Sequence, residues 1–178
     1  MNSVSKKITP WIIILLILLP CCKTPVQDQQ HENDRFEERT LLETNRYMRD
    51  RHRQHIMAFI QRAGWEMTET PTGLWYMILE PGSGQPVIPN RRIAYTFQTR
   101  LLNGEVCYSA ERDAPREIVA GKGEIEAGLQ EGLLLLREGS RARFIIPPYL
   151  AHGNFGDGNR IPGSSILLTE VEVISVKR

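Results

Sequence analysis

A β-hairpin signal at the centre of the chain most constrains its fold. A strand-like run extends from Ile93 to Leu102, the pair Asn103–Gly104 follows it, and a second run begins at Glu105. An Asn-Gly pair between two such runs is the strongest short-range signal for two antiparallel strands joined by a tight turn. The chain is therefore expected to contain an antiparallel sheet.

Other segments extend that sheet and add one short helix. Further strands are predicted at 74–79, 117–120, 140–147 and 164–177. Between them, one helical face carries four apolar residues, and Gly139 predicts the end of this helix after about three turns. The four residues are Ile125, Leu129, Leu133 and Leu136. No βαβ alternation occurs, so the predicted class is α+β, with an antiparallel sheet wrapped around one short helix.

A second helix is predicted upstream of this domain. From Arg35 to Ala63 apolar residues recur at three- and four-residue steps, and Gly64 follows. We assign 35–64 to a separate N-terminal amphipathic helix and 72–178 to the sheet domain. The middle of this helix is basic, which indicates either a solvated face or attraction to anionic lipid headgroups or an acidic partner. His52 and His55 share a face but lack the companions of a metal site, and are interpreted as surface histidines.

The start of the chain resembles a bacterial lipoprotein signal. Lys6 and Lys7 precede an apolar run over 11–19 that is too short to span a bilayer, and two cysteines follow it. We predict a signal peptide at 1–21, lipidation of Cys22 (or Cys21) and a polar tether over 22–34. An uncleaved short anchor is the alternative. The protein is then expected in the cell envelope, lipid-anchored to a membrane and facing the periplasm.

Composition narrows the function classes. The formal net charge of +1 gives no case for nucleic acid. Cys107 is the only cysteine left in the domain, so no internal disulfide is expected. No Cys or His pairs have zinc-ligand spacing, and no hydrolase or phosphate-loop motif occurs, so neither metal nor cofactor is expected. No oligomeric state is predicted.

The segment 144–163, "FIIPPYLAHGNFGDGNRIPG", is a long glycine-rich loop between two strands. Loops of this length inside a compact domain are uncommon, and those that exist are usually binding loops. We therefore expect this loop to contribute to a ligand site.

From Arg92 to Val176 the order of signals resembles the FK506-binding-protein family of peptidyl-prolyl isomerases. The resemblance is carried by "IAYTFQTRLLNGEV", by "GKGEIEAGLQEGLLLLREGSRARFIIPPYLAHG" and by "RIPGSSILLTEVEVISV". The upstream signal, the helix and "GWEMTETPTGLWYMI" resemble an exported lipoprotein subgroup from gliding bacteria of the Bacteroidetes type. The family resemblance implies an apolar pocket for a proline side chain, covered by the 144–163 loop as a flap.

Four positions match the family pattern. Tyr95 stands where the family has its pocket tyrosine, and Ile125 and Ile161 match apolar pocket residues. The backbone N–H of Glu126 corresponds to the donor that reaches a substrate carbonyl. Without the resemblance, Tyr95 is equally an ordinary strand aromatic with a satisfied hydroxyl.

Five other positions depart from the pattern, and the side chain of Glu126 also does so because it replaces an apolar one and brings a charge to the rim. The chain has Cys107 and Tyr108 for Phe-Asp, Leu129 for the floor tryptophan, His152 for the flap tyrosine and Thr169 for an aromatic. Cys107 is alternatively a packed core residue and His152 a solvent-facing one. These departures imply a weak isomerase acting on proline-containing segments of exported proteins. A non-catalytic peptide- or partner-binding lipoprotein on the same scaffold is the alternative.

Overall fold

The computed structural model describes residues 26–177, and the chain divides into two compact units, Met1–Thr44 and Asn45–Arg178. Helix α1 spans Val26–Ala63 and therefore contributes to both units. In the first unit, Phe36, Leu41 and Leu42 of this helix are exposed. The second unit contains every strand and the second helix.

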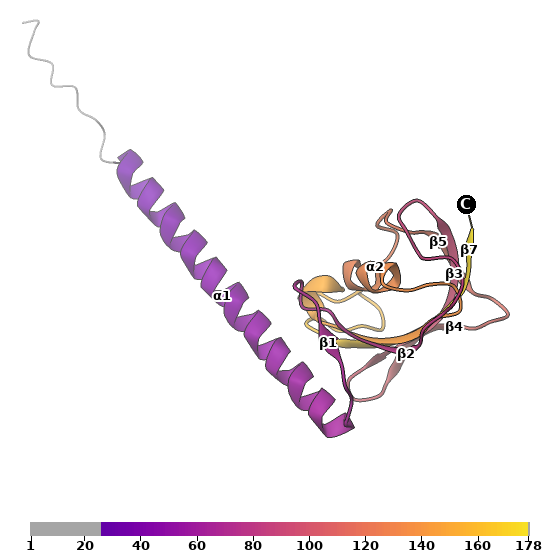
Figure 1. The fold of residues 1–178 in the computed structure, drawn as a ribbon. Helices are drawn as coiled ribbons and strands as arrows, with labels where there is room; N and C mark the ends of the chain where they lie inside the picture. The colour runs from indigo at the N-terminus through magenta and orange to yellow at the C-terminus, as the bar shows by residue number, and fades with distance from the viewer. Residues whose placement is uncertain (1–25, 178) are drawn as a thin grey trace, which may run out of the picture. The chain divides into compact units, whose positions relative to one another are not determined.

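The second unit is built on a seven-stranded antiparallel sheet with the order β1-β2-β6-β7-β3-β4, in which β5 also pairs with β3. Its predicted α+β class is confirmed. Helix α2 lies inside the curve of the sheet (Figure 1). The strands are β1 Thr68–Glu69, β2 Trp75–Glu80, β3 Arg92–Leu101, β4 Val106–Ala110, β5 Arg116–Val119, β6 Arg141–Ile146 and β7 Leu167–Lys177.

Strand β3 organises the concave face because it pairs with β7 on one side and with β5 and then β4 on the other. Side chains two residues apart on a strand share a face, and partners directly opposite share it too. Register therefore sets three rows across this face. They are Arg116–Tyr95–Val173, Ala110–Phe97–Val171 and Tyr108–Thr99–Thr169.

Helix α2 spans Ala127–Leu134, which is shorter than the predicted three turns. It ends early because the next turn tightens, with Leu135 and Leu136 donating backbone hydrogen bonds three residues back. The carbonyl of Leu136 then accepts from the N–H of Val87. Two glycines allow α2 to approach β6 closely. A Cβ on Gly128 would lie 2.5 Å from Cγ2 of Ile146, and one on Gly132 would lie 2.7 Å from the Phe144 ring.

The predicted tether over 22–34 is wrong for residues 26–34, which are helical. This segment has no glycine, Gln and Glu are good helix formers, and Pro25 directly precedes the first helical residue. Residues 22–25, the predicted signal peptide at 1–21 and the lipidated cysteine lie outside the described residues. Within 26–177, no helix combines the length and apolar character needed to cross a bilayer.

The last part of α1 packs on the convex face of the sheet, beginning before the predicted domain boundary at 72. Ile56 and Ile60 are buried in a cluster with Trp75 of β2 and Ile145 of β6. Arg53 adds a two-pronged hydrogen bond to the Glu69 carboxylate, with its shortest N–O distance at 2.7 Å. The sheet is therefore covered on both faces, by α2 inside and by α1 residues outside.

Candidate functional site

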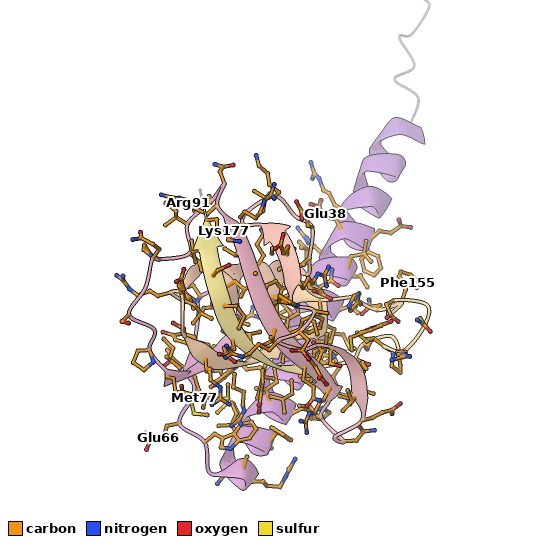
Figure 2. The ribbon with its side chains drawn as sticks, turned by 90° about the vertical axis from the view of Figure 1, so that its right-hand side faces the viewer. Glu38, Glu66, Met77, Arg91, Phe155 and Lys177 are labelled. Carbon is orange, nitrogen blue, oxygen red and sulfur yellow. The ribbon has the colours of Figure 1, made fainter. Side chains whose placement is uncertain are left out.

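The candidate site lies where the concave face meets the start of α2 and the flap. In the structure the flap spans 147–166 instead of the predicted 144–163, because 144–146 belong to β6. Phe155, labelled in Figure 2, lies on the flap. The flap begins with a short 3₁₀ helix, η3, at Pro148–Leu150. Five of the nine residues assigned to a pocket from the sequence form its floor, and each is at most 3% exposed. They are Tyr95, Cys107, Leu129, Ile161 and Thr169.

Three other assigned residues form the rim. Ile125, Glu126 and His152 are half-buried and line an open hollow of about 340 Å³. Arg116, Gly123, Glu124 and Ala151 complete its lining. The ninth residue, Tyr108, lies instead against the far end of the flap. The structure therefore separates the assigned residues into a closed floor, an open rim and one flap contact.

The Tyr95 hydroxyl is buried without a hydrogen-bond partner among the described residues. Burial raises the pKa of Tyr95 to about 12, and Glu126 and Glu124 act in the same direction while Arg116 opposes them. The phenol is therefore neutral at physiological pH and keeps its proton available for donation. A buried hydroxyl without a partner costs free energy, so this position is suited to an acceptor supplied by a ligand.

A second free donor stands at the rim. Glu126 is the N-cap of α2, where the first N–H groups of a helix lack acceptors inside the helix. Among the described residues, its backbone N–H has no hydrogen-bond acceptor. The side chain of Glu126 turns to the flap, where Oε1 lies 3.1 Å from Nε2 of His152. A substrate carbonyl at the rim can accept from this N–H without displacing an internal bond.

The far end of the flap is fastened to β4 by a cluster that we call the latch, made of Tyr108, Asp157, Asn159 and Arg160. The Tyr108 hydroxyl donates to Oδ2 of Asp157, and Arg160 Nη1 donates to the Cys107 carbonyl at 3.0 Å. Oδ1 of Asp157 accepts from the backbone N–H groups of Asn159 at 2.9 Å and Ile161 at 2.8 Å. The Tyr108 hydrogen bond, followed by those backbone donors, lowers the pKa of Asp157 to about 2. The latch therefore fixes the backbone at Ile161, the residue that the flap contributes to the floor.

Sequence reasoning missed Phe97 and Arg116. The Phe97 ring centroid lies 5.8 Å from that of Tyr95, and the Arg116 guanidinium carbon lies 5.9 Å from the Phe97 centroid. Phe97 supplies aromatic area next to Cys107 and Thr169, which stand where the family pattern has aromatic residues. The signal was present, because Phe97 is two residues after Tyr95 on the same strand and must share its face. Asp157 and Arg160 of the latch carried no comparable local signal.

The chemistry available here needs neither a nucleophile nor a metal. Burial raises the pKa of the Cys107 thiol, so the reactive thiolate is disfavoured. Within the part of the chain that the structure describes, no cluster of three or more His, Cys, Asp or Glu side chains could hold a metal ion. What the site offers is an apolar floor, aromatic area and free hydrogen-bond donors.

The family model described as FKBP-type peptidyl-prolyl cis-trans isomerase matches residues 84–174. The chain belongs to that family. Its match covers β3 to β6, α2, the flap and most of β7, and so contains every residue of the candidate site.

Curated relatives share this domain. A probable FKBP-type peptidyl-prolyl cis-trans isomerase of Haemophilus influenzae is 33% identical over 114 residues, covering 64% of this chain and 46% of the relative. Peptidyl-prolyl cis-trans isomerase FKBP10 of Mus musculus is 40% identical over 84 residues, covering 47% of this chain and 14% of the relative. The chain thus spans less than half the length of these two relatives.

Solved structures agree on the fold. The chain matches AtFKBP13 with a TM-score of 0.60 and 29% identity, covering 64% of this chain and 100% of that one. It matches FkpA from Escherichia coli with a TM-score of 0.63, covering 94% of this chain and 78% of that one. The latter identity is 21%, so that likeness supports the fold alone.

Proposed function

We propose that the chain is a peptidyl-prolyl cis-trans isomerase that assists the folding of exported proteins. Family membership supports the reaction class, and the lipoprotein-like N-terminus supports an envelope location with a lipid anchor. Its substrates are proline-containing segments of unfolded chains. The reaction consumes no cofactor, because it only changes the rate at which an X-Pro bond rotates.

The chemistry follows from the amide. Rotation about a peptide bond faces a barrier of about 18–20 kcal/mol because resonance must be broken. The cis and trans forms of an X-Pro bond differ by only about 0.5–1 kcal/mol, so catalysis needs to lower the barrier alone. The twisted amide is less polar than the planar one and is favoured by an apolar environment. Lowering the barrier by about 5–7 kcal/mol would accelerate rotation by roughly four to five decades.

Four of the rim and floor residues have a direct role in this proposal. Ile125 and Ile161 contact the proline ring and exclude water from the rotating bond. The N–H of Glu126 holds one substrate carbonyl. The Tyr95 hydroxyl donates to a second substrate acceptor as the X-Pro amide twists out of its plane. The observation that carries the proposal is the Tyr95 hydroxyl, which is buried without a partner among the described residues. Tyr95 pairs across the sheet with Arg116, which lines the hollow. An ordinary core tyrosine would have its hydroxyl satisfied.

The test is prolyl isomerisation followed by exchange NMR on short peptides that differ in the residue before proline. The wild-type chain should accelerate exchange, and Tyr95→Phe should lower that acceleration because only the donor is removed. Tyr47→Phe is the matched control, since Tyr47 is 61% exposed on α1. An acceleration that is equal in wild type and Tyr95→Phe would contradict the role of this hydroxyl.

A second candidate function is peptide binding without catalysis. One observation favours it, namely that the floor is closed, with Cys107 and Thr169 each 1% exposed. In this form the rim and flap hold an extended segment while its proline stays outside the floor. Saturable peptide binding with no acceleration for any peptide, by a chain shown to be folded, would select this function.

The proposed anchor is tested separately. Expression in a bacterium that lipidates exported proteins, with a labelled fatty acid, should label the wild-type chain. Cys22→Ser should abolish the label if Cys22 is the modified residue, and Cys21→Ser should do so if Cys21 is. Label retained in both single variants and in the double variant would exclude lipidation at this pair.

A further inference from the structure

A second cavity lies on the opposite face of the sheet from the prolyl site, within the unit 45–178. Its volume is about 440 Å³, and three elements line it. They are the α1 face containing Arg51, His52 and His55, the turn after β3 at 101–103, and the segment 164–166 that leads into β7. Nothing in the proposed isomerase chemistry uses this cavity.

One wall of the cavity is cationic. Arg51, His52 and His55 all come from α1, and none of the described residues in the lining carries a carboxylate. Arg51 also lies over the Tyr47 ring, 5.9 Å from its centroid, and among the described residues its guanidinium forms no ion pair with an acid. The neighbouring His55 and Arg51 disfavour the charged form of His52, and an anion bound among the three side chains would offset that repulsion.

The imidazole of His52 lacks a partner for one of its ring nitrogens. Its Nδ1 atom is buried and has no hydrogen-bond partner among the described residues. Burial, then the neighbouring charges of His55 and Arg51, lower the pKa of His52. The turn at 101–103 and the segment 164–166 contribute no ionisable group to the cavity. Only α1 therefore sets the charge that His52 experiences here.

The facing wall carries hydroxyl and amide groups on a constrained backbone. Ser164 has φ of 58°, a left-handed conformation that is uncommon for a residue with a side chain. Its N–H donates to the Gly153 carbonyl at 2.9 Å, which holds the segment in place. Ser165 and Asn103 stand beside it in the lining. A strained residue held at a cavity indicates a functional constraint.

We propose that this cavity binds a phosphate group. Donors converge on it from two sides, with a guanidinium fork, two imidazoles and two serine hydroxyls, which suits the tetrahedral array of acceptors on phosphate better than a planar carboxylate. The remaining lining is apolar and leaves room for an organic group esterified to the phosphate. It consists of Met48, Leu101, Leu102 and Ile166. The ligand is either free inorganic phosphate or a phosphate headgroup on a lipid.

The experiment is an NMR titration of the full chain, following the imidazole signals of its 4 histidines. Sodium phosphate is added at pH 7 with ionic strength held constant by sodium chloride. The signals of His52 and His55 should shift saturably, with a dissociation constant of about 1 mM or lower, and the pKa of His52 should rise in the bound state. Arg51→Gln should weaken binding about tenfold, as expected for loss of a charge-assisted hydrogen bond.

Arg62→Gln is the matched control, because Arg62 is exposed in the last turn of α1 and lies outside the cavity lining. Dihexanoyl phosphatidic acid provides the second arm. Tighter binding than inorganic phosphate assigns the site to a lipid headgroup, and equal binding assigns it to free phosphate. The proposal is overturned by shifts that fail to saturate, by equal binding in Arg51→Gln and wild type, or by a response to zinc chloride alone.

Discussion

Nε2 of His152 lies 3.1 Å from Oε1 of Glu126, and this contact joins the near end of the flap to the N-cap of α2 across the hollow. The two side chains are 25% and 22% exposed, so solvent screens the pair only in part. The contact crosses the place where a peptide would enter. It therefore couples flap position to the residue whose backbone N–H would hold the substrate.

Breaking this contact should cost a small, measurable free energy of unfolding. We expect a double-mutant cycle with Glu126→Gln and His152→Ala to give a coupling of about 0.2–1 kcal/mol, the range of partly exposed pairs. Glu124→Gln is the control, since Glu124 lines the same hollow and is exposed. Urea unfolding of the four cycle members and the control supplies the data. A coupling of zero would show that the two side chains do not interact in solution.

The Tyr95 hydroxyl should separate stability from function. Because it is buried without a partner, Tyr95→Phe is expected to stabilise the fold by about 1 kcal/mol, since the cost of an unsatisfied hydroxyl is removed. The same variant is expected to lose isomerase activity. Chemical denaturation and exchange NMR on one preparation measure both effects. A loss of stability would mean that the hydroxyl is satisfied in the folded chain, for example by ordered water.

The latch between β4 and the flap predicts a pH dependence of stability. The folded pKa of Asp157, about 2, lies below its ordinary value of 3.8. The ionised latch therefore stabilises the fold above about pH 4, and this contribution is lost as the pH falls from about 4 towards 2. The Tyr108 hydrogen bond to Asp157 raises the pKa of Tyr108, so its contribution is present below pH 10 and is lost above it.

Thermal unfolding between pH 2 and pH 7 tests the predicted loss of stability at acid pH. Wild type should unfold at a higher temperature than Asp157→Asn at pH 6, and the difference should shrink below pH 4. Asp113→Asn is the control, because Asp113 is exposed in the turn after β4. If the difference in unfolding temperature stays constant down to pH 2, the effect of Asp157→Asn does not arise from the ionisation of Asp157.

Much of the fold followed from local signals. The strand-like run from Ile93 to Leu102 corresponds to β3, and the run that begins at Glu105 corresponds to β4. The Asn103–Gly104 pair lies in the turn between them, where Gly104 has φ of 94°. These predictions succeeded because side-chain alternation and turn geometry are properties of a few neighbouring residues. The predicted length of α2, about three turns, was too long, because the chain tightens after Leu134 and Leu136 then accepts a hydrogen bond from distant Val87.

The site was less predictable for the same reason. Comparing positions with the family pattern pointed to Tyr95 and Ile161 but could not show that Phe97 fills part of the space left by smaller neighbours. Likewise, the acidic partner of Tyr108 is Asp157, which lies on the flap and not on β4. Contacts between segments distant in sequence define both features, and no local pattern records such contacts.

Leu129 illustrates what the structure adds. In the sequence it replaces a tryptophan of the family pattern, and in the structure it is 3% exposed and packed in the main core. Because Leu129 is buried in a packed core, Leu129→Trp is expected to overpack the floor and destabilise the fold by about 1–3 kcal/mol. Leu135→Trp is the control, since Leu135 is 43% exposed. Unchanged stability in Leu129→Trp would indicate that the floor opens readily enough to admit a ring.

The last part of α1 should behave as part of the folded domain. Ile56 is 1% exposed in the cluster with Trp75, Ile145 and Ile166. Ile56→Ala should therefore destabilise the domain by about 2–5 kcal/mol, the cost of a cavity in a well-packed core. Met57→Ala changes the next residue of the same helix, which is 44% exposed, and should have little effect. Urea unfolding monitored by tryptophan fluorescence tests this, because Trp75 reports on the cluster itself. Equal stability of the two variants would mean that α1 does not pack on the sheet in solution, and would remove one wall of the proposed phosphate cavity.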